Sequence, residues 1–490
     1  MGKDRKRKSR ISSRQRITVL LSRIIFTGFF VLGTVFFLSG CQTTSKEEAK
    51  YVFVFLGDGM GINQVASTRY WEAQEEGQSG EESIWKKESF DSFPVTGFMS
   101  THNMELGVTD SAASATAIFS GKKTKNGFLN YNPETEEAYT PFAKKLKESG
   151  YAVGVISTTS LEHASPAALY ANAEDRYQYE EIARQGIACG WLDFWAAGGF
   201  HGEEEMLFRE AEDNGFTVAR TLEELKNLDG SSLPVLAAAK SSFAGAYMDY
   251  EIDCARAEKY GAENISFSIQ IRACFTKSEN ISFSDFVKQA LVCMEKEEKF
   301  FLFAEAGKID TACSEGDMIS SMYEVKALDD AVAEAIKFYE KHPEETLIVV
   351  LADHETGSMR IRTDMDCSQI SGQVASYARF ELIMQELYEK KAPFSEAMEN
   401  AEHYFGIVEN QLEEEEKEEL KKAYTEGAEA FTGELCKMKA DKAKIQLVSG
   451  SHSGQPVPVY AIGKGAEIFS GVYDNTEIYE KLNTIMDFQE

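Results

Sequence analysis

The sequence predicts an α/β fold in which helices cover both faces of a mostly parallel central sheet. Near-continuous apolar runs alternate with segments of helical periodicity, and such runs are typical of strands that are buried on both faces. Helical spacing is seen, for example, in TPFAKKLKESG and in SMYEVKALDDAVAEAIKFYEKH. This alternation favours three layers of helices, sheet and helices. The expected strands are YVFVFL (51–56), YAVGVIS (151–157), FFLFAEA (300–306), TLIVVLAD (346–353) and VPVYAIG (457–463).

Residues 1–40 are interpreted as an export signal rather than as part of the fold. A basic segment precedes IIFTGFFVLGTVFFL (24–38). This apolar run is uncharged and shorter than a typical transmembrane helix. The LSGC that follows resembles the lipobox of bacterial lipoproteins, in which the signal is cut before the cysteine and the thiol is lipidated. An uncleaved anchor is the alternative, but the small residues before Cys41 favour lipidation. We therefore expect a body outside the cytoplasm, anchored to the cell membrane through Cys41 and a short linker (41–49).

The remaining residues, 50–490, are predicted to form one large domain with insertions. Residues 200–290 are mixed in character and 361–445 are charged and helical, so both are interpreted as elaborations of the core. A separate cap domain formed by 361–445 is the alternative interpretation. The net charge of −29 argues against nucleic acid or anionic lipid as a partner. The eight cysteines are irregularly spaced and predict neither a disulfide framework nor a thiolate zinc site.

Polar side chains directly follow several of the expected strands. In an open α/β sheet, ligands bind outside the carboxyl ends of the strands, so these side chains are expected to converge at one edge. Buried carboxylates are costly unless a cation compensates them. Histidine with carboxylates suits zinc, and oxygen-rich subsets suit magnesium. The residues are Asp58 in GDGMG, Glu305 and Asp310 in EAGKID, Asp353 and His354 in ADHETG, and His452 in SGSHSG.

Ser111, at the start of SAASATAIFSG, has two competing interpretations. Ser or Asp before an Ala-rich segment is a good helix N-cap, because its side-chain oxygen accepts a hydrogen bond from a free backbone N–H. A hydroxyl becomes a nucleophile at neutral pH only where a base or a metal activates it. The carboxylate and histidine residues above are what such a metal would need.

Seven sequence segments occur in order along the chain: FLGDGMG, VTDSAASATAIFSGKKT, SPAALYANAEDR, AEAGKID, LADHETG, SGSHSG and VPVYAIGKGAEIFSGVYDNTEI. With these segments the sequence resembles a bacterial alkaline phosphatase, a metal-dependent phosphomonoesterase with a three-layer fold. DSAASATA and ADHETG are specific to that family, whereas GDGMG alone is shared with wider relatives. The resemblance implies hydrolysis of small phosphomonoesters, with release of inorganic phosphate through a phosphoserine intermediate.

The resemblance also implies roles for single residues. Ser111 matches the serine that is phosphorylated, so we interpret it as both a helix start and the nucleophile. Arg176 in NAEDR matches the arginine that clamps two phosphate oxygens. The zinc that activates the serine would be held by Asp58, Asp353 and His354.

Two further metal sites follow from the same resemblance. Asp310 and His452 match ligands of a second zinc, which serves the hydrolysis of the phosphoserine. His163 in LEHASP is expected to touch the magnesium shell through water. The magnesium ligands would be Glu305, Ser165 and the bridging Asp58.

The second zinc site departs from the family pattern. The family places a histidine four residues after the aspartate, and Ser314 stands there instead. A neutral hydroxyl is a far poorer zinc ligand than imidazole. The site could hold zinc weakly with Ser314, Cys313 or Glu315 filling in, hold magnesium or cobalt instead, or stay mostly empty. We favour an active enzyme with altered metal affinity.

Two other functions are alternatives to this one. A lipoprotein that captures phosphate or a phosphorylated ligand without turnover is motivated by the missing histidine. A phosphodiesterase or sulfatase is disfavoured, because Ser111 is followed by AASA rather than by the Cys/Ser-x-Pro-x-Arg context that sulfatases need. Family members are often homodimers, although the sequence shows no dimer interface. The run GFHGEEE (199–205) has no assigned role, and its His201 is interpreted as a surface or structural residue.

Overall fold

The computed structural model describes residues 48–488 apart from 79–82, 86–88, 240–245, 261–279 and 363, and apart from the side chains of 256–260. The residues from Glu48 onward form one compact unit. The interpreted export signal and Cys41 lie outside the described residues. Within the described part of the chain, no helix is both long enough and apolar enough to cross a membrane.

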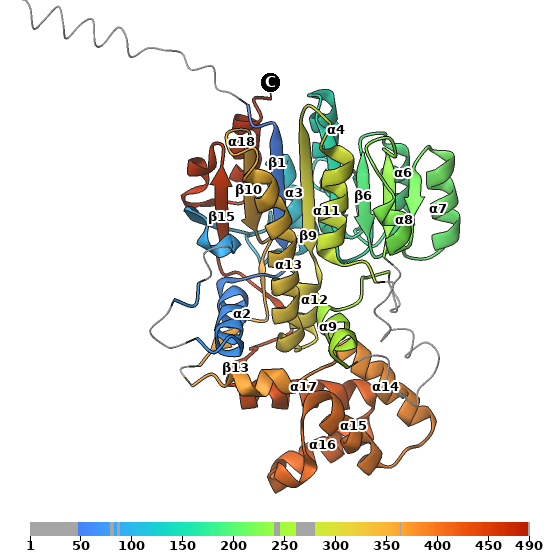
Figure 1. The fold of residues 1–490 in the computed structure, drawn as a ribbon, viewed down its shortest axis with the longest axis vertical. Coiled ribbons are helices and arrows are strands. Elements are labelled where there is room, and N and C mark those ends of the chain that lie inside the picture. The colour runs from blue at the N-terminus through green and yellow to red at the C-terminus, as the bar shows by residue number, and fades with distance from the viewer. Residues whose placement is uncertain are drawn as a thin grey trace, which may run out of the picture. The chain divides into compact units, whose positions relative to one another are not determined.

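A ten-stranded sheet runs through this unit in the order β16-β2-β15-β10-β1-β9-β5-β6-β8-β7 (Figure 1). Its strands run in one direction apart from β15, which is antiparallel to both of its neighbours. The prediction of a mostly parallel sheet is confirmed, and all five expected strands form. The strands are β1 (Tyr51–Gly57), β2 (Val95–Ser100), β5 (Ala152–Ser157), β6 (Phe194–Ala197), β7 (Thr217–Ala219), β8 (Val235–Ala238), β9 (Phe300–Ala306), β10 (Thr346–Leu351), β15 (Val457–Gly463) and β16 (Gly471–Asp474).

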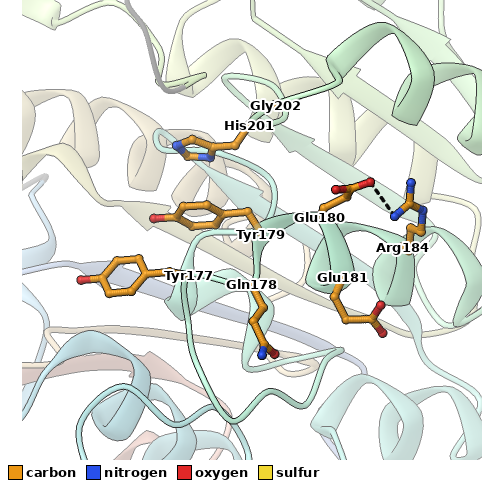
Figure 2. Close-up of a pocket in the computed structure, with 8 residues that line it drawn as sticks. All are labelled: Tyr177, Gln178, Tyr179, Glu180, Glu181, Arg184, His201 and Gly202. Atoms are coloured by element: carbon orange, nitrogen blue, oxygen red, sulfur yellow. Dashed lines mark ion pairs between the residues drawn. The ribbon is translucent and has the colours of Figure 1, made fainter.

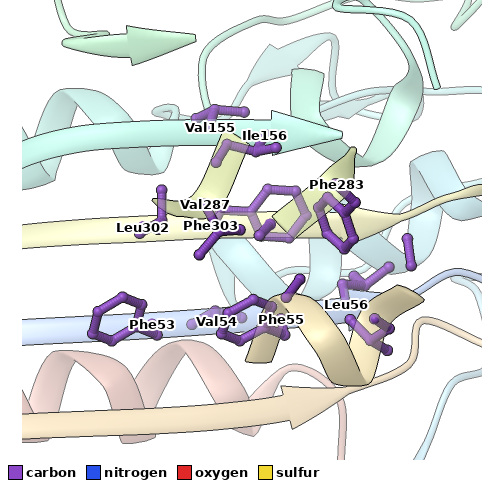
Figure 3. Close-up of a cluster of buried hydrophobic side chains, with 14 of the residues drawn as sticks. Phe53, Val54, Phe55, Leu56, Val155, Ile156, Phe283, Val287, Leu302 and Phe303 are labelled. Carbon is purple, nitrogen blue, oxygen red and sulfur yellow. The ribbon is translucent and has the colours of Figure 1, made fainter. Parts of the chain in front are cut away.

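Helices cover both faces of the sheet, as predicted. Successive side chains of a strand point to opposite faces, and β9 shows this clearly. The ring of Phe300 lies 5.4 Å from that of Phe338 on α13, whereas the ring of Phe303 lies 5.3 Å from that of Phe119 on α3. Apolar side chains of β1, β5 and β9 fill the core between these layers (Figure 3). The covering helices are α11 (Phe283–Met294) and α13 (Met318–Tyr339) on the first face, and α3 (Ser111–Ser120), α4 (Phe142–Glu148) and α18 (Glu477–Ile485) on the other.

The two elaborations differ in how they pack. Strands β7 and β8, from the mixed segment, extend the central sheet at its edge beyond β6. The charged segment forms four helices with a hydrophobic cluster of their own, which includes Phe380, Phe405 and Phe431. Figure 1 shows this helical group on the side toward which the parallel strands run. Its helices are α14 (Tyr377–Glu389), α15 (Phe394–Phe405), α16 (Glu414–Glu426) and α17 (Ala428–Ala443).

Further helices and strands connect the elements described above. The remaining helices are α2 (Ile62–Glu75), α5 (Ala164–Ala167), α6 (Tyr179–Ala188), α7 (Glu204–Asp213), α8 (Leu222–Lys226), α9 (Glu251–Tyr260) and α12 (Lys308–Ser314). The remaining strands are β3 (Tyr131–Asn132), β4 (Glu137–Ala138), β11 (Glu355–Thr356), β12 (Arg360–Ile361), β13 (Ile445–Gln446) and β14 (His452–Ser453).

Candidate active site

The carboxyl ends of β1, β9 and β10 bring carboxylates together at one edge of the sheet. The register of β1 sets Leu56 opposite Leu351 of β10 and opposite Glu305 of β9. Asp58 and Asp353 each follow two residues later. Because adjacent parallel strands end at the same level, these side chains emerge side by side.

The turn after β1 depends on Gly59. Its φ of +73° is one that L side chains rarely adopt, and an added Cβ would lie 2.8 Å from Oγ1 of Thr356 and 3.0 Å from Cα of Asp310. Its N–H donates to Oδ1 of Asp353 at 3.1 Å. A glycine here therefore lets three segments of the site approach one another closely.

Three groups of possible metal ligands occupy this edge. Within each group, one ligand atom from every residue lies within 4.8 Å of the others. The groups are contiguous, since Asp58 and His354 each belong to two of them. Ser165 is buried beside Glu305 and has the oxygen that the predicted magnesium site needs. The groups are Asp58, Asp353 and His354; Asp58, His163 and Glu305; and Asp310, His354 and His452.

The negative charges of the carboxylates in the site are not fully compensated by nearby cations. Both oxygens of Asp58, Oδ2 of Asp353 and Oε1 of Glu305 are buried without a hydrogen-bond partner among the described residues. Burial, together with the charges of Asp353 and Asp310, raises the pKa of Asp58 well above its ordinary value. Burial also raises the pKa of Asp353 to about 6. Such a set of carboxylates and imidazoles fits divalent cations, which supply the missing charge.

His354 lies at the centre of the site. Burial lowers the pKa of His354 to about 3, which favours the neutral imidazole that binds metals. Its Nε2 lies 3.2 Å from Oδ2 of Asp353 and 3.5 Å from Oδ1 of Asp58. The same nitrogen is 3.5 Å from Oγ of Ser111. The candidate nucleophile therefore faces the group that the resemblance assigns to its activating zinc.

The N-terminus of α3 presents Ser111 to the site. Asp110 is the N-cap, and its Oδ1 accepts a hydrogen bond from the N–H of Ala113 at 2.9 Å. Because Asp110 caps the helix, the hydroxyl of Ser111 is not used for capping. The hydroxyl of Ser114 donates to the carbonyl of Asp353 at 2.7 Å and ties the helix to the end of β10.

Arg176 reaches the same helix end from a distant loop. Its Nη1 lies 3.2 Å from Oδ2 of Asp110, and its Nη2 lies 3.2 Å from Nε2 of His163. Its backbone N–H donates to the carbonyl of Gly127 at 2.8 Å, and the N–H of Gly127 donates to Asp110 at 2.9 Å. A guanidinium held beside backbone N–H groups at a helix start forms a site for an anion.

The third group has a histidine with a defined orientation. Nδ1 of His452 lies 2.9 Å from the carbonyl oxygen of Thr109, so Nδ1–H donates and Nε2 keeps its lone pair. That Nε2 lies 3.5 Å from Oδ1 of Asp310, which also accepts a hydrogen bond from the hydroxyl of Thr356. Asp310 and His452 are thus together, as the resemblance implies, and His354 is the third member of their group.

Ser314 is exposed at the end of α12. Its neighbours make contacts elsewhere: Sγ of Cys313 lies 3.9 Å from Nε2 of Gln64, and Oε2 of Glu315 accepts a hydrogen bond from the hydroxyl of Tyr250 at 3.0 Å. Neither Cys313 nor Glu315 belongs to a ligand group found among the described residues.

Asp110 is the site residue whose second contact the sequence analysis missed. Its position before Ser111 indicated a cap, but nothing local indicated its pairing with Arg176, which is 66 residues away in the chain. The sequence around His354 likewise gave no indication that this residue belongs to two ligand groups.

The chain is similar to known proteins along most of its length. The family model described as alkaline phosphatase matches residues 49–190 and 201–488. Alkaline phosphatase 3 of Bacillus subtilis is 27% identical over 456 residues, which cover 89% of this chain and 88% of the relative. The crystal structure of a cold-active alkaline phosphatase from Shewanella sp. is 26% identical with a TM-score of 0.73, covering 89% of this chain and 99% of that one. The Thermus thermophilus alkaline phosphatase is 24% identical and shares the fold with a TM-score of 0.74, covering 90% and 92% of the two chains. The chain belongs to the alkaline phosphatase family.

Proposed function

We propose that this protein hydrolyses phosphomonoesters through a phosphoserine formed on Ser111. The main support is the position of its Oγ at the start of α3, 3.5 Å from Nε2 of His354, in a site whose buried carboxylates have oxygens without a hydrogen-bond partner among the described residues. Membership of the alkaline phosphatase family supports phosphomonoester hydrolysis in general.

The three ligand groups would hold the metals that the family implies. Zinc would be bound by Asp58, Asp353 and His354, and a second metal by Asp310 and His452. Magnesium would be bound by Glu305, Ser165 and Asp58, with His163 nearby. When bound, these cations lower the pKa of the serine hydroxyl and neutralise charge on the phosphoryl oxygens.

The reaction then consists of two nucleophilic displacements at phosphorus. Oγ of Ser111 attacks phosphorus, the bond from phosphorus to the ester oxygen breaks, and the alcohol leaves with a proton. Water attacks the phosphoserine next, the bond from phosphorus to Oγ breaks, and inorganic phosphate is released. In both steps, Arg176 and the N–H groups of α3 bind the equatorial oxygens.

The second metal site is proposed to have altered affinity rather than to be lost. Its aspartate and histidine lie together, but Ser314 offers only an exposed hydroxyl where the family has imidazole. With one imidazole fewer than in the family pattern, this site is expected to prefer magnesium or cobalt to zinc.

The cellular location is proposed from the sequence alone. Lipidation of Cys41 would anchor the protein to the outer side of the cell membrane, where its substrates are small phosphomonoesters. Recognition of the phosphoryl group, which all monoesters share, implies that many different phosphomonoesters are hydrolysed.

The test is hydrolysis of p-nitrophenyl phosphate by the protein without residues 1–40, first stripped of metal and then titrated with zinc, magnesium or cobalt. We expect turnover that needs metal and that falls by roughly 10³-fold or more in Ser111→Ala. Ser120→Ala, at the other end of α3, is the matched control and keeps activity. A parent protein that binds phosphate but stays inert with every metal would instead be a binding lipoprotein. Full activity in Ser111→Ala would refute the nucleophile.

A further inference from the structure

A pocket of about 500 Å³ adjoins Arg176. It is lined by the segment Tyr177–Glu181, which directly follows the arginine, by Arg184 of α6, and by His201 from the GFHGEEE run that had no assigned role. Figure 2 shows Tyr177, Tyr179 and His201 extending to one side of this segment, away from Glu181 and Arg184. One side of the pocket is therefore aromatic.

The aromatic side chains contact one another in a defined arrangement. The rings of Tyr179 and His201 are stacked, with centroids 4.2 Å apart and an angle of 6° between their planes. The ring of Tyr177 meets that of Tyr179 edge-on at 6.0 Å. Tyr177 is 67% exposed, so much of its side chain is accessible to a ligand. An exposed ring next to packed rings offers a stacking surface for another planar group.

Buried contacts hold this surface in place. Oε1 of Glu162 accepts a hydrogen bond from the backbone N–H of His201 at 2.6 Å and lies 2.9 Å from its Nδ1. Glu162 itself is fully buried. His201 therefore gives Tyr179 a fixed stacking partner, and Tyr179 in turn contacts the ring of Tyr177.

The surface is continuous with the phosphate-binding residues. The guanidinium carbon of Arg176 lies 5.8 Å from the centroid of the Tyr177 ring. The other end is joined through Tyr247, whose ring meets those of His201 at 6.0 Å and His163 at 6.2 Å. Since His163 also contacts Arg176, a phosphoryl group on the arginine would lie within reach of this surface.

The charges around the pocket indicate a neutral ligand. Glu180 and Glu181 lie at its wall, and the cation of Arg184 is already paired with Glu180 at 2.7 Å and with Glu210 at 3.1 Å. A second anionic group would therefore be repelled here. The pocket suits the uncharged part of a monoester rather than a further phosphate.

We propose that this aromatic pocket binds the alcohol part of the substrate, and that it favours phosphomonoesters whose alcohol carries a planar ring, such as a nucleoside or a benzyl group. The proposal rests on the proposed function, since Arg176 must bind the phosphoryl group for the ring to reach Tyr177. The pocket makes specificity depend on the alcohol, although the chemistry acts on the phosphoryl group alone.

The test compares substrates that share a leaving group but differ in the ring. 5′-AMP and ribose 5-phosphate both release a ribose 5′-hydroxyl, and benzyl and cyclohexylmethyl phosphate both release a primary alcohol. With the zinc- and magnesium-loaded protein, we expect kcat/KM to favour the planar member of at least one pair. Tyr177→Ala should reduce that preference roughly tenfold, which corresponds to about 1.4 kcal/mol of stacking. Tyr177→Trp should keep it.

Two controls separate the outcomes. Tyr70→Ala removes another exposed tyrosine, on α2, and should leave the preference unchanged. Binding of the same ligands to Ser111→Ala, measured by calorimetry, should show the same preference without turnover.

The pair of substrates whose preference falls in Tyr177→Ala identifies which planar alcohol the pocket takes. An equal loss for both members of each pair, or no loss in Tyr177→Ala, overturns the pocket while hydrolysis stands. If no substrate is hydrolysed, the proposed function fails instead, and the calorimetry still tests the pocket.

Discussion

Oδ2 of Asp110 lies 3.2 Å from Nη1 of Arg176, while Oδ1 of the same carboxylate caps α3 through the N–H of Ala113. One side chain therefore both starts the helix that carries Ser111 and orients the guanidinium beside it. Oδ2 also accepts a hydrogen bond from the N–H of Gly127 at 2.9 Å, so this side chain joins the helix start to two other segments.

Asp110→Asn should weaken phosphate binding more than it weakens the fold. Asparagine caps a helix about as well as aspartate, so the melting temperature should fall only slightly, through loss of the bond from the N–H of Gly127. The charge-assisted contact to Arg176 is lost, and kcat/KM for p-nitrophenyl phosphate should fall about tenfold, with weaker inhibition by inorganic phosphate. Initial rates and thermal unfolding check both statements. An unchanged phosphate inhibition constant would show that Asp110 does not orient the arginine.

Ser314→His should restore a ligand to the second metal site. Residue 314 lies one helical turn after Asp310 on α12, so an imidazole there lies on the same face as the carboxylate. Zinc affinity should rise by at least the roughly tenfold that even outer-shell partners contribute. Bound zinc after dialysis against limiting metal, with Ser314→Ala as control, is the measurement. Identical zinc content in the two variants would contradict the assignment of this site.

Removal of metal should destabilise the protein. Without a cation, the buried carboxylates of Asp58, Asp353 and Glu305 repel one another. Chelation should therefore lower the melting temperature, with each kcal/mol worth about 2–4 °C or less in a chain of this size. Asp58→Asn removes one of these charges, so in chelator it should melt above the parent and gain less from added metal. Calorimetric scans with and without metal decide this, and equal shifts for both proteins would count against Asp58 as a ligand.

Arg69→Met should affect stability rather than chemistry. The fully buried Arg69 pairs with Glu72 and Asp91, each at 2.6 Å. Removing the cation leaves carboxylates buried without a counter-charge, at a cost of about 3–5 kcal/mol. Denaturant unfolding measures this loss, and Arg69→Met/Asp91→Asn should recover part of it. A loss below about 1 kcal/mol would mean that the pair is not important for folding.

Cys41→Ser tests the proposed anchor. Full-length parent protein, produced in a bacterial host that lipidates exported proteins, should partition into the detergent phase of a Triton X-114 extraction. The variant should move to the aqueous phase with its phosphatase activity unchanged, because Cys41 lies outside the described catalytic unit. Retention of the variant in the detergent phase would favour the uncleaved anchor.

Much of the fold was predictable because burial of a strand or helix determines the pattern of apolar residues within that segment. A strand such as β1 or β9 that is covered on both faces must be apolar along its length, and the expected runs therefore became strands. Strands β2, β6, β7, β8 and β16 were not predicted. Four of them are only three or four residues long, and such short runs have no distinctive periodicity. The fifth, β2, has the sequence VTGFMS, which contains a glycine and polar residues and so lacks a continuous apolar run.

By itself, the sequence determined which chemical groups are available and which elements carry them: Asp58 after one strand, Asp353 and His354 after another, and Ser111 at the start of a helix. Only the tertiary structure decided how these groups meet. Strand register brings Asp58 level with Asp353, packing places His354 between two ligand groups, and a distant loop brings Arg176 to Asp110. The physical reason is that polarity and periodicity act between neighbours in the chain, whereas a site depends on contacts between residues that are hundreds of positions apart. The aromatic pocket at Tyr177 and His201 is the clearest case, because no motif marked either residue before the fold placed them together.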